Sequence, residues 1–131
     1  MSRPVSASTA LSGKFRQSIT VGNHTLIGDE STEAGGDDAG PDPHEYLLAA
    51  LASCTSMTVQ TYTDRKGWPL RSVRVDVVGA RKDETYAITR TIHLDGDLDA
   101  EQRARVLDIA NKCPVHRTLT GKIEITSELA G

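Results

Sequence analysis

Cysteine occurs at two positions of this 131-residue sequence, 54 and 113. A thiolate can attack an oxidant, join a second thiol in a disulfide or bind a metal ion. Zinc is disfavoured because neither cysteine belongs to a C-x₂₋₄-C pair. A structural disulfide is disfavoured if the protein stays in a reducing cytoplasm. Two interpretations stay open, namely a redox-active pair or two buried side chains that act as small apolar groups.

Cys54 falls within the helix that the sequence predicts most clearly. Asp42 suits the N-cap position, a proline follows it, and Glu45 stands where a capping box places its carboxylate. Residues 45–66 contain no glycine or proline, and Gly67 suits the position just past a helix end. These features predict one helix of about six turns. The small side chains before Cys54 permit close packing, so this helix is predicted to be central.

The rest of the chain alternates apolar and polar residues with the period of strands. Strands are predicted over residues 14–21 and 24–28 with a Gly22-Asn23 hairpin turn, over 70–79, across Tyr86, Ile88, Ile92 and Leu94, and at Ile123 and Ile125. A second helix is predicted from its cap Asp99, with Gln102 as capping-box partner, to Cys113, followed by a short turn from Pro114 through Leu119.

The predicted order ββαββαβ indicates an α+β fold with antiparallel sheets around a long central helix. Residues 1–13 are predicted to be a flexible tail, followed by a single domain over residues 14–131. The acidic, glycine-rich stretch 29–40 has no periodicity and is predicted to be a mobile loop.

Composition excludes several classes of function. Charged residues make up 25% of the chain, the formal net charge is −3, and the basic residues are scattered, so no nucleic-acid partner is expected. No apolar run approaches the roughly 20 residues that span a bilayer, so no membrane partner is expected. The N-terminus lacks the apolar segment of a secretory signal, which predicts a cytoplasmic protein. Because aromatic residues are few, a partner subunit is expected to complete the core.

Two stretches around the cysteines carry a resemblance to a known family. GPDPHEYLLAALASC, which ends at Cys54, resembles the helix-opening motif of the OsmC/Ohr family. ANKCPVHRTL, which contains Cys113, resembles the second motif of that family, a Cys-Pro after a helix. Both occur in the expected order, and the resemblance covers nearly all of residues 14–129. It implies an intertwined homodimer with active sites at the subunit interface.

The resemblance also implies a thiol peroxidase reaction that needs no metal or bound cofactor. Cys54 as thiolate would attack an organic hydroperoxide or hydrogen peroxide and become a sulfenic acid. Cys113 would condense with it to a disulfide, which an external thiol or dithiol would reduce. Peroxidase members stabilise the thiolate with an N-terminal arginine held by a glutamate; the matching candidates here are Arg16 and Glu45.

Four residues leave alternatives open. Arg90 is a second candidate for the cation near Cys54, because it shares the apolar parity of its strand; otherwise its stem lies along the sheet with its charge in solvent. His44 stands where well-known peroxidase members carry the functional glutamate, and Glu45 is also explained as a helix-capping residue. His116 could act as a base for Cys113, but a histidine in a short helical turn more often faces solvent. The chain is thus predicted to be a hydroperoxide reductase of a less characterised branch of the family. The alternative is a non-enzymatic redox sensor or small-molecule binder. A metal-binding thiol protein is the third hypothesis.

Overall fold

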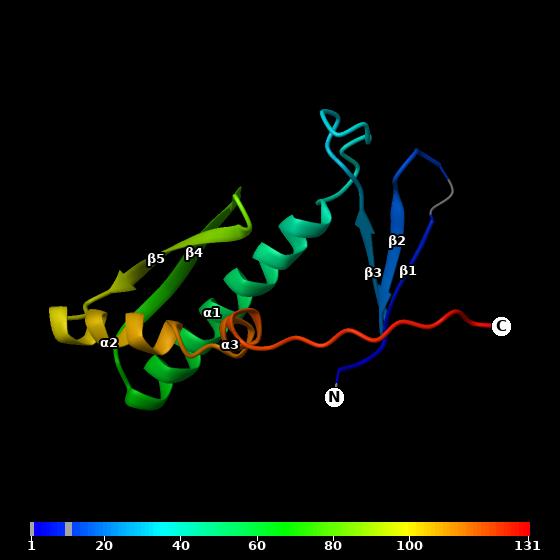
Figure 1. Ribbon diagram of the computed structural model, residues 1–131. Coiled ribbons are helices and arrows are strands. Elements are labelled where there is room, and N and C mark those ends of the chain that lie inside the picture. The colour runs from blue at the N-terminus through cyan, green and yellow to red at the C-terminus, as the bar shows by residue number, and fades with distance from the viewer. Residues whose placement is uncertain (1, 10–11) are drawn as a thin grey trace. The chain divides into compact units, whose positions relative to one another are not determined.

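The computed structural model describes residues 2–9 and 12–131, so residues 1, 10 and 11 of the predicted tail lie outside the described residues (Figure 1). The chain forms two compact units, Met1–Leu47 and Leu48–Gly131. Both contain antiparallel strand pairs and helices are present beside them, which confirms the predicted α+β class. The prediction of a single domain over residues 14–131 stays a prediction. Among the described residues, no helix is long and apolar enough to cross a membrane.

The first unit contains a three-stranded antiparallel sheet in the order β1-β2-β3. Its strands are β1 (Val5–Thr9), β2 (Gln17–Val21) and β3 (His24–Gly28). The predicted hairpin turn is present, with Val21 paired to His24 and Gly22 at a φ of 58°. The prediction of a flexible tail is wrong for residues 5–9, because β1 pairs with β2 along its whole length. The residues of β1 are small and mostly polar and do not predict a strand. The hydrogen bonds to the backbone of β2 hold them in the extended conformation.

The stretch 29–40, predicted to be a mobile loop, contains an organised network around one buried carboxylate. Asp29 is 3% exposed. Its carboxylate accepts hydrogen bonds from the backbone N–H groups of Glu30, Asp37 and Ala39, at 2.8, 3.3 and 3.0 Å. Burial raises the pKa of Asp29, but these hydrogen bonds, of which that of Ala39 has the largest effect, and the charge of Arg16 hold it below its usual value. The acidic side chain thus fixes the backbone of the loop.

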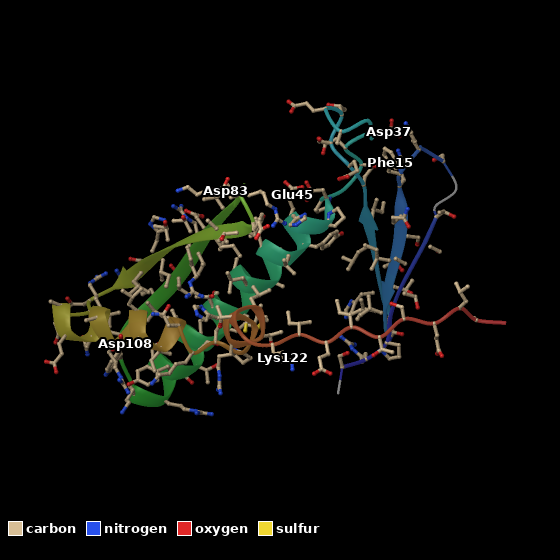
Figure 2. The ribbon with its side chains drawn as sticks, in the orientation of Figure 1. Phe15, Asp37, Glu45, Asp83, Asp108 and Lys122 are labelled. Carbon is tan, nitrogen blue, oxygen red and sulfur yellow. The ribbon has the colours of Figure 1, made fainter. Side chains whose placement is uncertain are left out.

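Helix α1 (Pro43–Lys66) matches the helix predicted from the sequence. The backbone N–H of Asp42 donates to Glu45 Oε1, and that of Glu45 donates to Asp42 Oδ1, both at 2.8 Å, which completes the predicted capping box. Figure 2 shows Glu45 at the start of this helix. Gly67 follows the helix with a φ of 68°, a conformation that glycine adopts without strain.

The second unit packs one face of α1 against a β-hairpin. Strands β4 (Leu70–Lys82) and β5 (Thr85–Gly96) pair antiparallel, with Asp83 in their tight turn (Figures 1 and 2). The buried residues of α1 recur at every fourth position: Leu51, Thr55, Val59 and Thr63. Val59 forms the core with residues of the second helix, and partly buried side chains of the hairpin pack on it: Trp68, Leu70, Val73, Ile92 and Leu94.

Two further helices close the second unit. Helix α2 (Ala100–Ala110) has the predicted capping box between Asp99 and Gln102, and α3 (Pro114–Thr120) occupies the predicted short turn. The closing strand predicted at Ile123 and Ile125 is absent from the described residues, where the chain after Gly121 forms no helix or strand. A strand needs the backbone of a neighbour, and no described strand pairs with this segment. Both isoleucines are exposed.

Candidate active site

Cys54 lies on the edge of the buried face of α1. It precedes the fully buried Thr55 in the sequence, and its own side chain is half-buried. It is one wall of an open groove of about 470 Å³. The groove is largely apolar and has two basic residues among its lining side chains: Met57, Thr58, Thr61, Tyr62, Arg65, Ile109, Lys112 and Pro114. A small molecule can therefore approach Cys54 from this groove.

Cys113 is completely buried and is the N-cap residue of α3. Its Sγ accepts a hydrogen bond from the backbone N–H of His116 at 3.3 Å and lies 3.7 Å from Thr55 Oγ1. The side chain of Cys54 lies near enough to lower the pKa of this thiol. The prediction that the second helix extends to Cys113 is wrong, because α2 ends at Ala110 and Cys113 caps the new helix that Pro114 begins. The two thiols, remote in sequence, meet where α1 and the start of α3 pack together.

Arg90 extends from β5 toward the same place. Its Nη1 donates to Thr55 Oγ1 at 3.0 Å and lies 4.0 Å from Cys113 Sγ. Its Nη2 lies 2.9 Å from Asn111 Oδ1 and 3.0 Å from His116 Nδ1. Because the guanidinium has only donors, the His116 Nδ1 that it contacts is unprotonated. The guanidinium is thus fixed on both sides, with Cys113 beside it.

The electrostatics of this cluster favour a charged Cys113. Burial raises the pKa of its thiol, but the backbone N–H of His116, the Thr55 hydroxyl, the Cys54 side chain and the charge of Arg90 together bring that pKa below its ordinary value. Burial, and then the charge of Arg90, lower the pKa of His116. The imidazole therefore stays neutral near neutral pH and accepts a hydrogen bond from Arg90, as the contact requires.

The other two predicted site residues belong to the first unit, where both make local contacts. Arg16 Nη2 lies 3.6 Å from Asp37 Oδ2, and its Nη1 is 3.4 Å from Ser12 Oγ. Its Nε is buried and makes no hydrogen bond to any described residue. Glu45 caps α1 through Asp42. Their assignment to the site of Cys54 stays a prediction.

The arrangement suits thiol chemistry better than metal chemistry. A dithiol–disulfide cycle uses an accessible thiol, a second thiol near it and a cation that stabilises a thiolate, and all three are present here. Among residues 2–9 and 12–131, no group of three or more His, Cys, Asp or Glu side chains could hold a metal ion. Toward the Cys113 sulfur the backbone N–H of His116 donates at 3.3 Å, and the Arg90 guanidinium lies at 4.0 Å; both stabilise its anion.

Sequence reasoning missed two members of the cluster and weighed against a third. Thr55 directly follows Cys54 on the buried side of α1, and Asn111 lies in the turn after α2. His116 was expected to face solvent, but its ring contacts Arg90 and is half-buried. Arg90 itself carried a signal, since a charged residue at an apolar position of a strand needs partners inside the fold.

Comparisons with known proteins agree with this fold. The family described as OsmC-like protein matches residues 35–128. No curated protein matches the chain in sequence.

Several solved structures are similar to the chain. The OsmC-like protein from Mycoplasma pneumoniae has a TM-score of 0.77 at 19% identity, with 92% of this chain and 89% of that chain covered. An organic hydroperoxide resistance protein OsmC from Legionella pneumophila has a TM-score of 0.69 at 16% identity, with 92% and 90% covered. The organic hydroperoxide resistance protein OhrB of Bacillus subtilis has a TM-score of 0.64 at 18% identity, with 92% of each chain covered. These likenesses extend over nearly the whole chain and show a shared fold.

Proposed function

Because the chain belongs to the OsmC-like protein family, we propose that it reduces hydroperoxides with Cys54, Cys113 and an external thiol. The observation that supports the proposal is that an accessible thiol lies near a buried one, since Thr55, which follows Cys54, lies 3.7 Å from Cys113 Sγ, and Cys54 lowers the pKa of that thiol. Two structures with the same fold are of proteins named for organic hydroperoxide resistance. The proposal gives the chain a peroxide-related protective role in the cytoplasm, where thiols are kept reduced.

In the proposed cycle the Cys54 thiolate attacks the distal oxygen of the hydroperoxide. The O–O bond breaks, the alcohol leaves with a proton, and Cys54 becomes a sulfenic acid. The groove beside Cys54 admits the peroxide, and its apolar lining favours an organic one. Cys113, which solvent does not reach, then attacks the Cys54 sulfur, and the sulfenic oxygen leaves as hydroxide. An external dithiol reduces the resulting disulfide.

We further propose that the working form is a homodimer. The C-terminal segment carries Ile123, Ile125 and Leu129, which are 55%, 86% and 98% exposed. A second copy that pairs with this segment would cover these side chains and supply the backbone partner that the predicted closing strand requires. Arg16 and Glu45 would reach the site of Cys54 in that assembly, as the family resemblance implies. Sedimentation analysis tests the dimer, and a monomer at all concentrations would contradict it.

A non-enzymatic redox sensor is the second candidate, and one observation favours it. The carboxylate of Glu45 is engaged in the cap of α1 and Arg16 pairs with Asp37, so both predicted thiolate-stabilising residues have other contacts. A sensor would form the disulfide once per oxidation event without sustained turnover, whereas an enzyme would consume many equivalents of peroxide.

The test measures cumene hydroperoxide consumption in the presence of a dithiol. The wild type should consume many equivalents, and Cys54→Ser should consume none above the uncatalysed rate. Cys113→Ser should lose turnover and gain oxygen at Cys54, seen by mass spectrometry. Wild-type consumption no faster than that of Cys54→Ser would reject the peroxidase. One equivalent consumed with a disulfide formed in the absence of the dithiol, and no sustained consumption when the dithiol is added, would identify the sensor instead.

A further inference from the structure

Arg90 is a half-buried cation whose contacts are unusual for an arginine at such a position. Among the described residues it makes no ion pair with a carboxylate. Other basic side chains of the described chain, such as Arg16, Arg71 and Arg74, do pair with an aspartate. Its partners Thr55, Asn111 and His116 are neutral groups. A positive charge removed from water is stabilised by a nearby anion. Among the described groups that contact Arg90, the sulfur of Cys113 is the one that can supply it.

We infer that Arg90 is a positioning residue that keeps Cys113 as a thiolate, ready to close the disulfide on an oxidised Cys54. The disulfide-closing role rests on the proposed function, but the ionisation of Cys113 does not. In the closing step the Cys113 thiolate forms the S–S bond and the S–O bond of the Cys54 sulfenic acid breaks. Hydroxide leaves and takes a proton from solvent to become water. No reagent besides the sulfenic acid is consumed.

The two terminal nitrogens of Arg90 are held by hydrogen bonds, so the guanidinium stays 4.0 Å from the sulfur and stabilises its negative charge from that distance. Nη2 is held by Asn111 Oδ1 and His116 Nδ1, and Nη1 by Thr55 Oγ1. These contacts direct one N–H group of Nη1 toward the sulfur. They hold the positive charge of Arg90 at this place in both the dithiol and the disulfide state. Lysine could supply the charge but not this geometry.

Within the described part of the chain, the titratable and charged groups around Cys113 come from three elements. Arg90 approaches from β5, Cys54 from α1, and His116 belongs to α3. His116 contacts the sulfur through its backbone N–H, and its ring stays neutral near neutral pH, so its titration contributes little to the charge around the sulfur. The Cys54 side chain lowers the pKa of Cys113, and Cys54 must be removed if Cys113 is to be titrated alone.

The experiment therefore titrates Cys113 in the Cys54→Ser protein, where it is the only cysteine left. Thiolate formation is followed by ultraviolet absorbance, which requires no reagent to reach the buried sulfur. The Cys54→Ser/Cys113→Ser protein supplies the tyrosine background. Adding Arg90→Gln should raise the titration midpoint by about one pH unit or more, the effect of losing a neighbouring opposite charge. An unchanged midpoint in a folded variant overturns the inference.

Matched variants separate the charge from its geometry. Arg74→Gln removes an exposed cation from the neighbouring strand, 71% exposed in its side chain, and should leave the midpoint unchanged. Arg90→Lys should give an intermediate midpoint. Asn111→Ala frees Nη2 without removing a charge and should give a small rise. If Arg90→Gln does not fold by circular dichroism, the last two variants decide, and midpoints equal to that of Arg74→Gln overturn the inference.

Peroxide consumption distinguishes the two proposals. A midpoint that rises without Arg90, in a protein that consumes no cumene hydroperoxide, upholds the role of Arg90 in ionisation and rejects the peroxidase. Consumption by the wild type with a midpoint that does not respond to Arg90 upholds the peroxidase and rejects the role of Arg90.

Discussion

Truncation of Val59 should destabilise the second unit, because this side chain is completely buried at the centre of its core. The Val59→Ala change removes two methyl groups from packing against Val106 and Ala110. At about 0.8 kcal/mol for each buried methyl-sized group, the transfer term is about 1.6 kcal/mol, and a residual cavity adds to it. We expect a total loss of about 2–3 kcal/mol in the free energy of unfolding.

Urea unfolding followed by the fluorescence of Trp68 measures this loss. Trp68 is the one tryptophan of the sequence and packs against the core of the same unit, so its signal reports this core. Val78→Ala is the matched control, since Val78 lies on β4 and is 66% exposed. The control should change the free energy of unfolding by less than about 0.5 kcal/mol. Equal effects of the two substitutions would refute the packing argument.

Three further outcomes follow from local contacts. Asp99→Ala removes the capping box of α2 and should cost about 1 kcal/mol in urea unfolding, whereas Ser at this position should retain most of the stability. Arg71→Ala breaks an exposed ion pair with Asp95 and should leave the urea midpoint unchanged; a clear fall would show that this pair matters more than its exposure indicates. The folded-state pKa of Asp29 is lowered, so its carboxylate stabilises the folded state. This contribution to the free energy of unfolding is complete above about pH 5, beyond the unfolded pKa near 3.9, and is lost as pH falls through the folded-state pKa. The protection of the Ala39 amide, measured as its exchange rate relative to the intrinsic rate at the same pH, should fall over that range in the wild type. Asp29→Asn should show no such step.

The sequence predicted elements whose signals lie within a few residues. The cap at Asp42 and the glycine at position 67 bracket α1 almost to the residue, because capping depends on local hydrogen bonds. β1 was missed because its short, polar residues acquire a strand conformation only through β2. The closing strand at Ile123 was predicted from alternation alone, which does not say whether a partner strand is at hand.

In the candidate site, too, the residues with local sequence signals were predicted and those that depend on tertiary packing were not. The motifs around Cys54 and Cys113 marked both thiols, and the parity of Arg90 marked it as facing the interior. The convergence of Arg90 with Thr55 and Asn111 depends on how a strand, a helix and a turn pack, so no local pattern could predict it. Arg16 and Glu45 came from the family resemblance and stay predictions.

The fixed guanidinium beside Cys113 also bears on how readily the oxidised protein would be reduced. A disulfide carries no charge, so its formation would leave Arg90 without an anion in a half-buried place. Whatever stabilises the thiolate stabilises the dithiol state relative to the disulfide and raises the reduction potential. A disulfide formed here would be a comparatively strong oxidant, which a mild thiol could open.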